Sequence, residues 1–463
     1  MSTYQQTIDY LYASQPAFHL VGAVAYKPGL DNTYRLMAHL GNPHDKLRAI
    51  HVAGTNGKGS TSHLIAATLQ AQGYKVGLFT SPHLVDLRER IRISGEMISE
   101  DTVVQFVTEN RSFLDTLRPS FFETTMALAF WYFAQQQVDI AVIEVGLGGR
   151  LDSTNILTPL LSVITNIGID HTEFLGDTLP AIASEKAGII KPNIPCVIGE
   201  THPETQPIFL SHARECNILG DGIETTNCRL WFADQCGYMR KRRLKEAPVC
   251  QLQGNYQNKN QQTAFVVLQA LRNYCGISLS REAIATGFAE VCTLTGLRGR
   301  WEILSHSPLT ICDTGHNSHG IHYVADQLRS LITNHTTQHY TKLPNTTPNY
   351  PTLHHPTPHL RIILGMVGDK DIDVVLSTLH EEATYYFTQP ATSRAFSAQA
   401  LQAKWQALHP THTGSHSFTS ASEALTAAKK DASSKDIIFI GGSNYIVGEV
   451  LSAPYNNRTI TAQ

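Results

Sequence analysis

The sequence lacks the features that mark several large classes of protein. Its eight cysteines form no C-x-x-C pair, which argues against a zinc site or a disulfide frame and for reduced thiols in a cytoplasm. No apolar run approaches the roughly 20 residues that span a bilayer, and no signal-peptide pattern opens the chain. A formal net charge of −3 provides no general attraction to nucleic acid or to an anionic membrane. We therefore expect a cytoplasmic protein with no general attraction to nucleic acid or to membranes.

The sequence does contain a repeated alternation of apolar strands and helical patterns. A β-branched run such as 139–146 ends in loop residues, and helical patterns lie between such runs. This order predicts an α/β fold with a mostly parallel sheet, whose ligand loops lie at the carboxyl ends of the strands. A second series begins near Leu309. Because 463 residues are long for one hydrophobic core, we expect two domains, 1–296 and 297–463, with the linker within 293–302.

Two segments are rich in residue types that can bind ligands. Residues 332–359 contain many Thr, Pro, Asn and His residues, but nothing in their spacing defines a metal geometry. The composition favours a flexible surface insertion over a metal site. The basic stretch "MRKRRLK", residues 239–245, could contact an anionic ligand, although a solvated basic turn is the favoured interpretation.

The stretch "HVAGTNGKGS", residues 51–60, is similar to a phosphate-binding loop with altered spacing. Compared with the Walker A pattern, Gly54 stands closer to the Gly-Lys pair, and the hydroxyl residue comes one place late, at Ser60. The turn lies between a strand pattern and a helical pattern, where unpaired N–H groups and the positive end of the helix dipole meet. With Lys58 as a compact cation, the loop predicts binding of nucleotide phosphates. The alternative is a glycine turn that only joins a strand to a helix.

Three polar residues at or just beyond the ends of predicted strands could hold a magnesium ion: Ser81, Glu144 and His171. A carboxylate inside an apolar strand end is costly unless a cation or hydrogen bonds compensate it. Taken singly, Glu144 could be a structural carboxylate, and His171 could be a helix cap or a packed core histidine. Together with a phosphate loop at the same sheet edge they become magnesium ligands, with Ser81 replacing the displaced hydroxyl.

Lys186 is a separate case, because it lies in the helical stretch "SEKAGIIKP" directly after Glu185. On the sequence alone, the pattern favours a surface lysine paired with Glu185.

These motifs together resemble the folylpolyglutamate synthase/dihydrofolate synthase family, the folate branch of the Mur ligase superfamily. The matching stretches are "HVAGTNGKGS", "TSPHL", "IEVGLGGRLDSTN", "TNIGIDH", "SEKAGIIKP", "GNYQNKN", "GRWE", "DTGHN", "GMVGDKD" and "GGSNYIVGEVL". The resemblance implies a Mur-ligase-like P-loop ATPase domain followed by a Rossmann-like domain. It also implies an ATP-dependent amide ligase that joins L-glutamate to dihydropteroate or to the γ-carboxyl group of a reduced folate. The family's "GxHQ" reads "GNYQ" here, and "DxAHNP" reads "DTGHNS".

The resemblance assigns the nucleotide and metal contacts. The residues implied at the nucleotide are Gly54, Thr55, Asn56, Gly57, Lys58, Gly59, Ser60, Asn260 (at adenine), Arg300 and Asp313. Ser81 and Glu144 would bind one Mg²⁺, and Glu144 with His171 a second, with a monovalent cation such as K⁺ as a further candidate. Lys186 matches the lysine that family members carry as a carbamate, which requires a neutral amine and hence a depressed pKa.

The resemblance also implies the substrate contacts and the catalytic set. The pterin or folate would lie near Tyr26, Gly29, Phe122, Glu123, Leu151, Asp152 and Ser153. Glutamate and the transferred phosphate would lie near His316 and Asn317. The residues implied in catalysis are Lys58, Glu144, His171, Lys186 and His316. The family further implies a monomer that binds neither nucleic acid nor membrane.

Three other functions fit parts of the pattern. A Mur-type cell-wall ligase usually has a UDP-binding domain before the ATP loop, yet Gly54 leaves 53 residues for one here. A P-loop switch or motor would normally show a Walker B Asp, where this chain has Glu144 in a ligase-like motif. A nucleotide-binding module without catalysis would not need the set of Ser81, Glu144, His171 and Lys186.

Overall fold

The computed structural model describes residues 3–16, 29–218, 229–236, 248–337, 358–368 and 371–452. The chain divides into two compact units, 1–297 and 298–463, so the division lies within the segment expected to be the linker. None of the helices in the described ranges combines the length and the apolar character that a membrane crossing requires.

The first unit is built on an eight-stranded sheet in the order β4-β3-β2-β5-β1-β6-β7-β8. Its strands are β1 (Ala49–Ala53), β2 (Val76–Phe79), β3 (Ile91–Ile93), β4 (Glu96–Met97), β5 (Ile140–Glu144), β6 (Leu161–Ile164), β7 (Cys196–Ile198) and β8 (Leu230–Phe232). Strands β2, β5, β1, β6, β7 and β8 are parallel, whereas β3 and β4 form an antiparallel edge. The central strands are buried throughout, which explains their continuous apolar and β-branched sequences.

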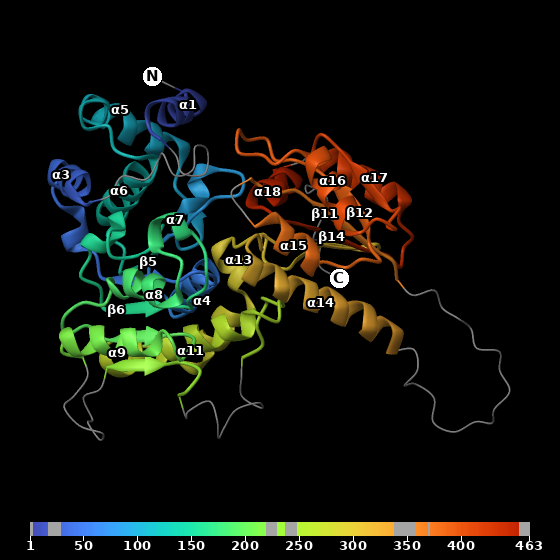
Figure 1. The fold of residues 1–463 in the computed structure, drawn as a ribbon. Coiled ribbons are helices and arrows are strands. Elements are labelled where there is room, and N and C mark those ends of the chain that lie inside the picture. The colour runs from blue at the N-terminus through green and yellow to red at the C-terminus, as the bar shows by residue number, and fades with distance from the viewer. Residues whose placement is uncertain are drawn as a thin grey trace. The chain divides into compact units, whose positions relative to one another are not determined.

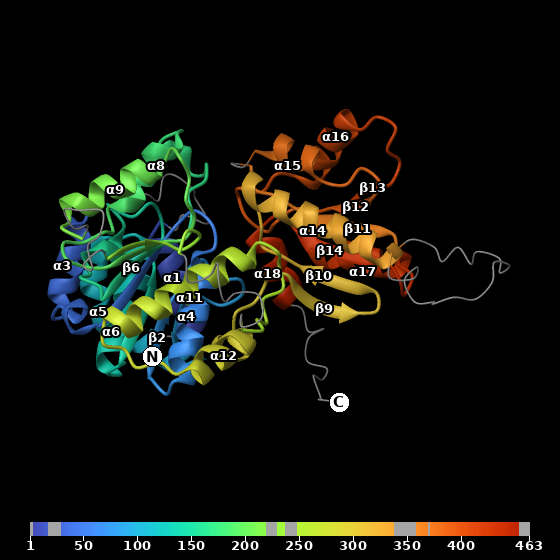
Figure 2. The same ribbon diagram turned by 90° about the horizontal axis from the view of Figure 1, so that it is seen from below.

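Helices cover both faces of this sheet (Figure 1). The helices are α1 (Tyr4–Ser14), α3 (Asp31–His39), α4 (Lys58–Ala71), α5 (Glu100–Leu117), α6 (Phe121–Gln135), α7 (Thr172–Leu175), α8 (Leu179–Ala187), α9 (Gln206–Glu215), α11 (Gln257–Tyr274), α12 (Arg281–Ala289) and α13 (Val291–Thr295). Short 3-10 helices are η2 (Pro43–Lys46), η3 (Leu87–Arg90) and η4 (Ser153–Ile156). One core packs α4, α11 and α12 against β1, and another packs α5 and α6 on the other face (Figure 2).

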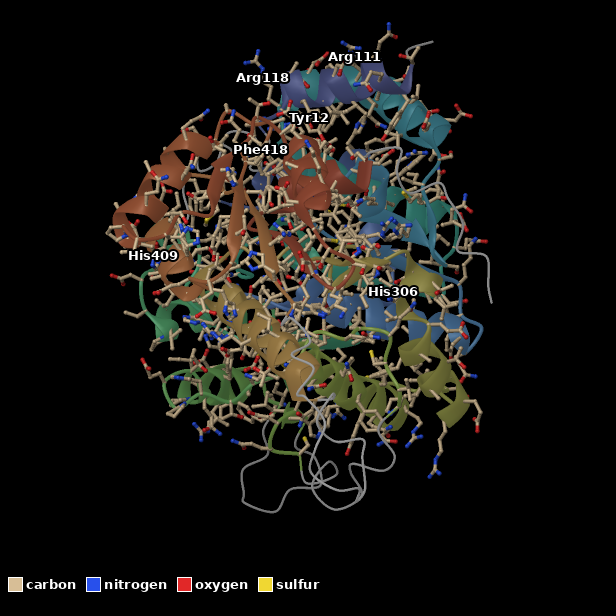
Figure 3. All side chains as sticks on the ribbon, turned by 90° about the vertical axis from the view of Figure 1, so that its right-hand side faces the viewer. Tyr12, Arg111, Arg118, His306, His409 and Phe418 are labelled. Atoms are coloured by element: carbon tan, nitrogen blue, oxygen red, sulfur yellow. The ribbon has the colours of Figure 1, made fainter. Side chains whose placement is uncertain are left out.

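The outermost helices of this unit are held by polar and aromatic contacts. The Tyr10 hydroxyl of α1 donates to Asp115 of α5 at 2.7 Å, and the Arg111 guanidinium lies 4.1 Å from the centre of the Tyr10 ring. Figure 3 shows Arg111 and Arg118 at the outer surface of these helices.

The second unit is a six-stranded sheet in the order β13-β12-β11-β14-β10-β9, with β9 antiparallel to β10 and the other pairs parallel. Its elements are β9 (Glu302–His306), β10 (Leu309–Cys312), α14 (Ser318–Thr337), β11 (Leu360–Leu364), α15 (Ile372–Thr378), β12 (Thr384–Phe387), α16 (Ala398–Leu408), β13 (Ser415–Ser417), α17 (Ala421–Asp431), β14 (Ile437–Gly441) and α18 (Asn444–Ser452). The predicted α/β class with mostly parallel sheets is confirmed.

The predicted start of the insertion at residue 332 is wrong, because residues 332–337 are still helical. Helix α14 continues to Thr337, because its amphipathic pattern runs into the polar stretch without a helix breaker. Residues 338–357 and the basic stretch 239–245 lie outside the described residues.

Candidate functional site

The glycine-rich loop connects β1 to α4, as the sequence predicted. Gly54 has φ +147° and Gly57 has φ +81°, values that side chains other than glycine rarely adopt. A Cβ at Gly54 would collide with Thr165 beyond β6, and a Cβ at Gly57 would collide with the Asn260 amide of α11. Both glycines are therefore required by the close packing of the loop on its neighbours.

Part of the loop's hydrogen-bonding capacity is already used within the protein. The N–H of Thr55 donates to the Asn166 carbonyl at 3.0 Å, and the N–H of Asn56 donates to Asn166 Oδ1 at 2.8 Å. The Thr55 hydroxyl donates to the Gly168 carbonyl at 3.1 Å. The donors that have no partner within the helix are those of the first turn of α4, which starts at Lys58. These N–H groups and the Lys58 ammonium form the positive end of the loop.

The Ser60 hydroxyl, which comes one place late in the loop, is hydrogen-bonded to another helix. Ser60 is 3% exposed, and its Oγ accepts a hydrogen bond from Gln257 Nε2 of α11 at 3.1 Å. The Gln257 amide oxygen in turn accepts from Asn260 Nδ2 at 2.9 Å, and Asn260 is the residue that packs on Gly57. Ser60 therefore ties the phosphate loop to α11.

Lys58 folds back over its own loop. Its Nζ donates to the carbonyls of Gly54 and Thr55 at 3.0 and 3.2 Å. The ammonium group is thus held by main-chain oxygens of its own loop.

The polar residues expected at the strand ends lie at one edge of the sheet. Glu144 ends β5, beside β1 and β2, and is 2% exposed. Its Oε2 accepts the backbone N–H of Ser81, which follows β2, at 3.1 Å. A Cβ built on Gly59 would lie 3.7 Å from the same oxygen, so the carboxylate lies next to the first turn of α4.

A small hollow lies beside the loop. It is lined by Gly54, Thr55, Lys58, Val145, Gly146, Leu147, Gly148, Asp170, His171, Leu175 and Lys186. The hollow brings Lys58, His171 and Lys186 together, although their positions in the sequence are far apart. Asp170 is a lining residue that the sequence analysis did not single out, although it directly precedes His171. His171 has φ +52° and donates its backbone N–H to Asp170 Oδ1 at 2.9 Å, which orients the Asp170 carboxylate.

The interpretation of Lys186 as a surface lysine is wrong. Lys186 is 4% exposed and lines the hollow, whereas Glu185 pairs with Arg150, whose Nη2 lies 2.8 Å from its Oε1. Burial, together with the charge of Lys58, lowers the pKa of Lys186 to about 7. The neutral amine of Lys186 is therefore far more accessible near pH 7 than that of an exposed lysine. The helix pattern could not reveal this, because small residues let α8 pack its lysine face inward.

The residues expected at the folate substrate have two kinds of environment. Phe122 packs on Gly146, next to the hollow, and a Cβ on that glycine would lie 2.5 Å from the ring. Glu123 instead forms a capping box at the start of α6: its Oε2 accepts the Ser120 N–H at 2.7 Å, and its Oε1 accepts from Thr33 at 3.3 Å. Both of its oxygens therefore have partners within the protein.

Asp152 is also engaged internally. Its Oδ2 accepts the N–H groups of Gly146 and Leu147 at 3.0 and 2.8 Å, and its Oδ1 accepts from Thr154. Burial raises the pKa of Asp152, while these hydrogen bonds act in the opposite direction. The carboxylate therefore shapes the loop between β5 and η4.

The remaining folate residues are less informative. Leu151 and Ser153, on either side of Asp152, are partly exposed. Gly29 precedes α3 with φ +104°, and Tyr26 lies outside the described residues.

In the second unit, the expected residues cluster after β10. Asp313 is buried and accepts the backbone N–H groups of Trp301 and Gly315 at 2.8 and 2.7 Å. His316 Nδ1 donates to the Thr314 carbonyl at 2.9 Å. In a neutral ring, Nε2 is then the nitrogen that can accept a hydrogen bond. Asn317 Oδ1 accepts the Gly320 N–H at 2.8 Å at the start of α14. Arg300 lies in the turn before β9 and is partly buried.

The donor set in the first unit fits magnesium. Across the described ranges, no group of three or more His, Cys, Asp or Glu side chains forms a metal cluster. A buried carboxylate from Glu144 with the Ser81 hydroxyl supplies oxygen ligands, which suit a hard cation bound by few protein groups and by phosphates. His171 adds a nitrogen donor at the hollow.

Comparison with known proteins identifies the family of the chain. Residues 52–203 match the model of the Mur ligase middle domain. The chain is 33% identical to the folylpolyglutamate synthase of Lacticaseibacillus casei, over 90% of this chain and 92% of that protein. It is 32% identical to the dihydrofolate synthase/folylpolyglutamate synthase of Escherichia coli, over 91% and 90%.

A solved structure extends the similarity to three dimensions. A bifunctional folylpolyglutamate synthase/dihydrofolate synthase with Mn, AMPPNP and L-glutamate bound matches with a TM-score of 0.77 and 28% identity, over 98% of each chain. On these similarities, which run through nearly the whole chain, the protein belongs to the folylpolyglutamate synthase/dihydrofolate synthase family of the Mur ligase superfamily.

Proposed function

We propose that this protein is an ATP-dependent ligase that adds L-glutamate both to dihydropteroate and to the γ-carboxyl group of a reduced folate. The observation that carries the proposal is the hollow beside the phosphate loop, where Lys58, His171 and the buried Lys186 meet in a chain of this family. Family membership argues against the cell-wall alternative.

The chemistry requires a carboxylate to become an acylating agent. Transfer of the γ-phosphoryl group of ATP to that carboxylate gives an acyl phosphate, which the glutamate amine attacks. Before transfer the carboxylate and three phosphates converge, so positive charge must offset their repulsion. Lys58 and the first turn of α4 supply part of this charge.

The proposal includes two Mg²⁺ sites. Ser81 and Glu144 would hold one ion, and Glu144, His171 and a carbamate on Lys186 would hold or orient the second. Bound Mg²⁺ would supply charge neutralisation for the phosphates and the carboxylate. The protein's own contribution is to keep the Glu144 carboxylate buried and oriented by the Ser81 N–H, 3.1 Å away.

The second unit would contribute Arg300 and Asp313 to nucleotide binding, and His316 and Asn317 to glutamate and the transferred phosphate. The folate would lie along Phe122 and the 151–153 segment. A monomeric enzyme, a cytoplasmic location and a role for K⁺ complete the proposal. Light scattering measures the oligomeric state, and turnover with and without K⁺ tests the role of that ion.

Purified protein should release ADP in the presence of ATP, Mg²⁺ and glutamate when either dihydropteroate or tetrahydrofolate is added. The reason is that both substrates present the same glutamate-accepting carboxyl chemistry at one hollow. Coupled detection of ADP, with mass analysis of the extended product, measures both activities. Omission of glutamate is the control. Extension of tetrahydrofolate with no ADP release on dihydropteroate would refute the synthase half of the proposal.

Glu144→Gln and His171→Ala should each shift the Mg²⁺ titration to higher concentration and lower turnover at saturating folate substrate. Each change removes a ligand from the sheet edge beside the phosphate loop. Glu109→Gln, which changes an exposed carboxylate on α5, is the matched control and should leave the titration unchanged. If both site variants titrate like the parent, these residues are not the metal ligands.

A further inference from the structure

His51 is a buried histidine in β1, three residues before the phosphate loop. Its side chain is 0% exposed, and burial lowers its pKa to about 3, so the ring is neutral. Its Nε2 lies 2.7 Å from the Thr154 hydroxyl, whereas Nδ1 has no hydrogen-bond partner among the described residues. An apolar residue would fill this core position without leaving a buried nitrogen unpaired. The single bond to Thr154 is therefore the feature that distinguishes a histidine here from its apolar neighbours in β1.

The bond to Thr154 is the first link of a chain. The Thr154 hydroxyl has one hydrogen, which it donates to Asp152 Oδ1, so His51 Nε2–H donates to Thr154. The Thr154 N–H also donates to Asp152 Oδ1, at 3.0 Å. The other Asp152 oxygen accepts the N–H groups of Gly146 and Leu147, and these two residues line the hollow.

We propose that His51, Thr154 and Asp152 form a buried positioning chain that holds the 146–147 wall of the hollow in the geometry needed for ligation. The inference rests on the proposed function. His51 and Thr154 do not line the hollow, so they act through Asp152 as positioning residues. The chain links the strand that precedes the glycine-rich loop to the 146–147 wall, across 103 residues of sequence between His51 and Thr154.

The first test compares Thr154→Val with Thr154→Ser. Valine keeps the shape of threonine but has no hydroxyl, whereas serine keeps the hydroxyl. Thr154→Val should lower kcat/KM for the folate substrate by about 10-fold to 100-fold, as small misplacements of a reacting group do. Thr154→Ser should remain within a few-fold of the parent. ADP affinity, measured by calorimetry, should be unchanged in both, because ADP reports on the loop and not on the opposite wall.

A second histidine–threonine pair provides the matched control. His63 Nδ1 lies 2.7 Å from Thr295 Oγ1, both residues are buried, and neither lines the hollow. Thr295→Val removes an equivalent hydroxyl and should leave kcat/KM near the parental value. Equal losses in Thr154→Val and Thr295→Val would show a general effect of core damage and overturn the proposal. A tenfold loss of ADP affinity in Thr154→Val would also overturn it, because the chain would then act on the phosphate loop.

Variants of His51 test the donor itself. His51→Gln has an amide N–H near the position of Nε2 and should retain more kcat/KM than His51→Asn, whose shorter side chain does not reach Thr154. The reverse order would contradict the assignment. If the parent protein shows no folate-dependent ADP release, the proposed function fails. The hydrogen-bonded chain from His51 to Asp152 is then tested by unfolding free energies alone. In that case His51→Leu and Thr154→Val must be non-additive in unfolding free energy, and additivity would refute the chain.

Discussion

Lys58→Met should lower kcat for ligation by about 10²-fold or more at saturating ATP, as other losses of a charge-stabilising group do. Methionine keeps most of the lysine stem and removes the ammonium group that lies at the mouth of the loop, bonded to the Gly54 and Thr55 carbonyls. The variant should fold, because the loop is also held by Asn166 and by the packing of Gly54 and Gly57. Turnover in a coupled ADP assay, with the unfolding midpoint as a check, measures the effect.

Two further variants separate charge from position. Lys58→Arg keeps the charge but replaces a compact ammonium with a planar guanidinium, so it should recover only part of the activity. Lys46→Met, which changes an exposed lysine of η2, should behave as the parent. Near-parental turnover in Lys58→Met would show that this loop does not bind the phosphates of ATP.

Lys186→Met should also reduce ligation by about 10²-fold or more, because the carbamate would be a charged group at the reacting phosphates. An exposed lysine–glutamate pair would contribute only about 0.3–0.5 kcal/mol, and its loss would be nearly silent. Lys186 is instead buried in the hollow, with a pKa lowered to about 7. Its neutral amine can add to the carbon of CO₂ and lose a proton, which converts a cation into an anion. In Lys186→Ala, which removes the side chain beyond Cβ, added acetate should restore part of the activity by occupying the vacated volume.

The modification itself can be detected independently of activity. Protein incubated with ¹³C-bicarbonate should show one carbamate resonance that disappears in Lys186→Met. Lys191→Met is the matched control, because Lys191 is a half-buried lysine whose pKa is also lowered by burial and whose Nζ donates to the Asn155 carbonyl at 2.8 Å. The resonance should persist in this control. The assignment is wrong if the spectrum of the parent shows no carbamate signal. It is also wrong if a crystal structure with ATP analogue, Mg²⁺ and bicarbonate shows an unmodified ammonium at Lys186.

The local features of the site could be predicted from the sequence because they depend on neighbours along the chain. A strand pattern, a turn with Gly54 and Gly57, and a helical pattern together specify a loop at a helix N-terminus. Glu144 and Ser81 could be placed at the same edge because the carboxyl ends of parallel strands meet there. The α/β class followed from the same alternation of strands and helices.

The structure was needed wherever the outcome depended on packing between distant segments. Sequence periodicity favoured an exposed Lys186, and only the packing of α8 against the hollow buries it. The commitment of Ser60 to Gln257, 197 residues away, follows from the position of α11 and not from the loop.

The sequence by itself therefore determined the α/β class, the glycine-rich loop between β1 and α4 and the polar residues at the strand ends, because each depends on short-range pattern or on the geometry of parallel strands. The tertiary structure decided the burial of Lys186, the inclusion of Asp170 in the hollow, and the link from His51 through Thr154 to Asp152. Burial and hydrogen bonding between distant segments set the charge state and orientation of a side chain, and they exist only once the sheet and its helices have packed.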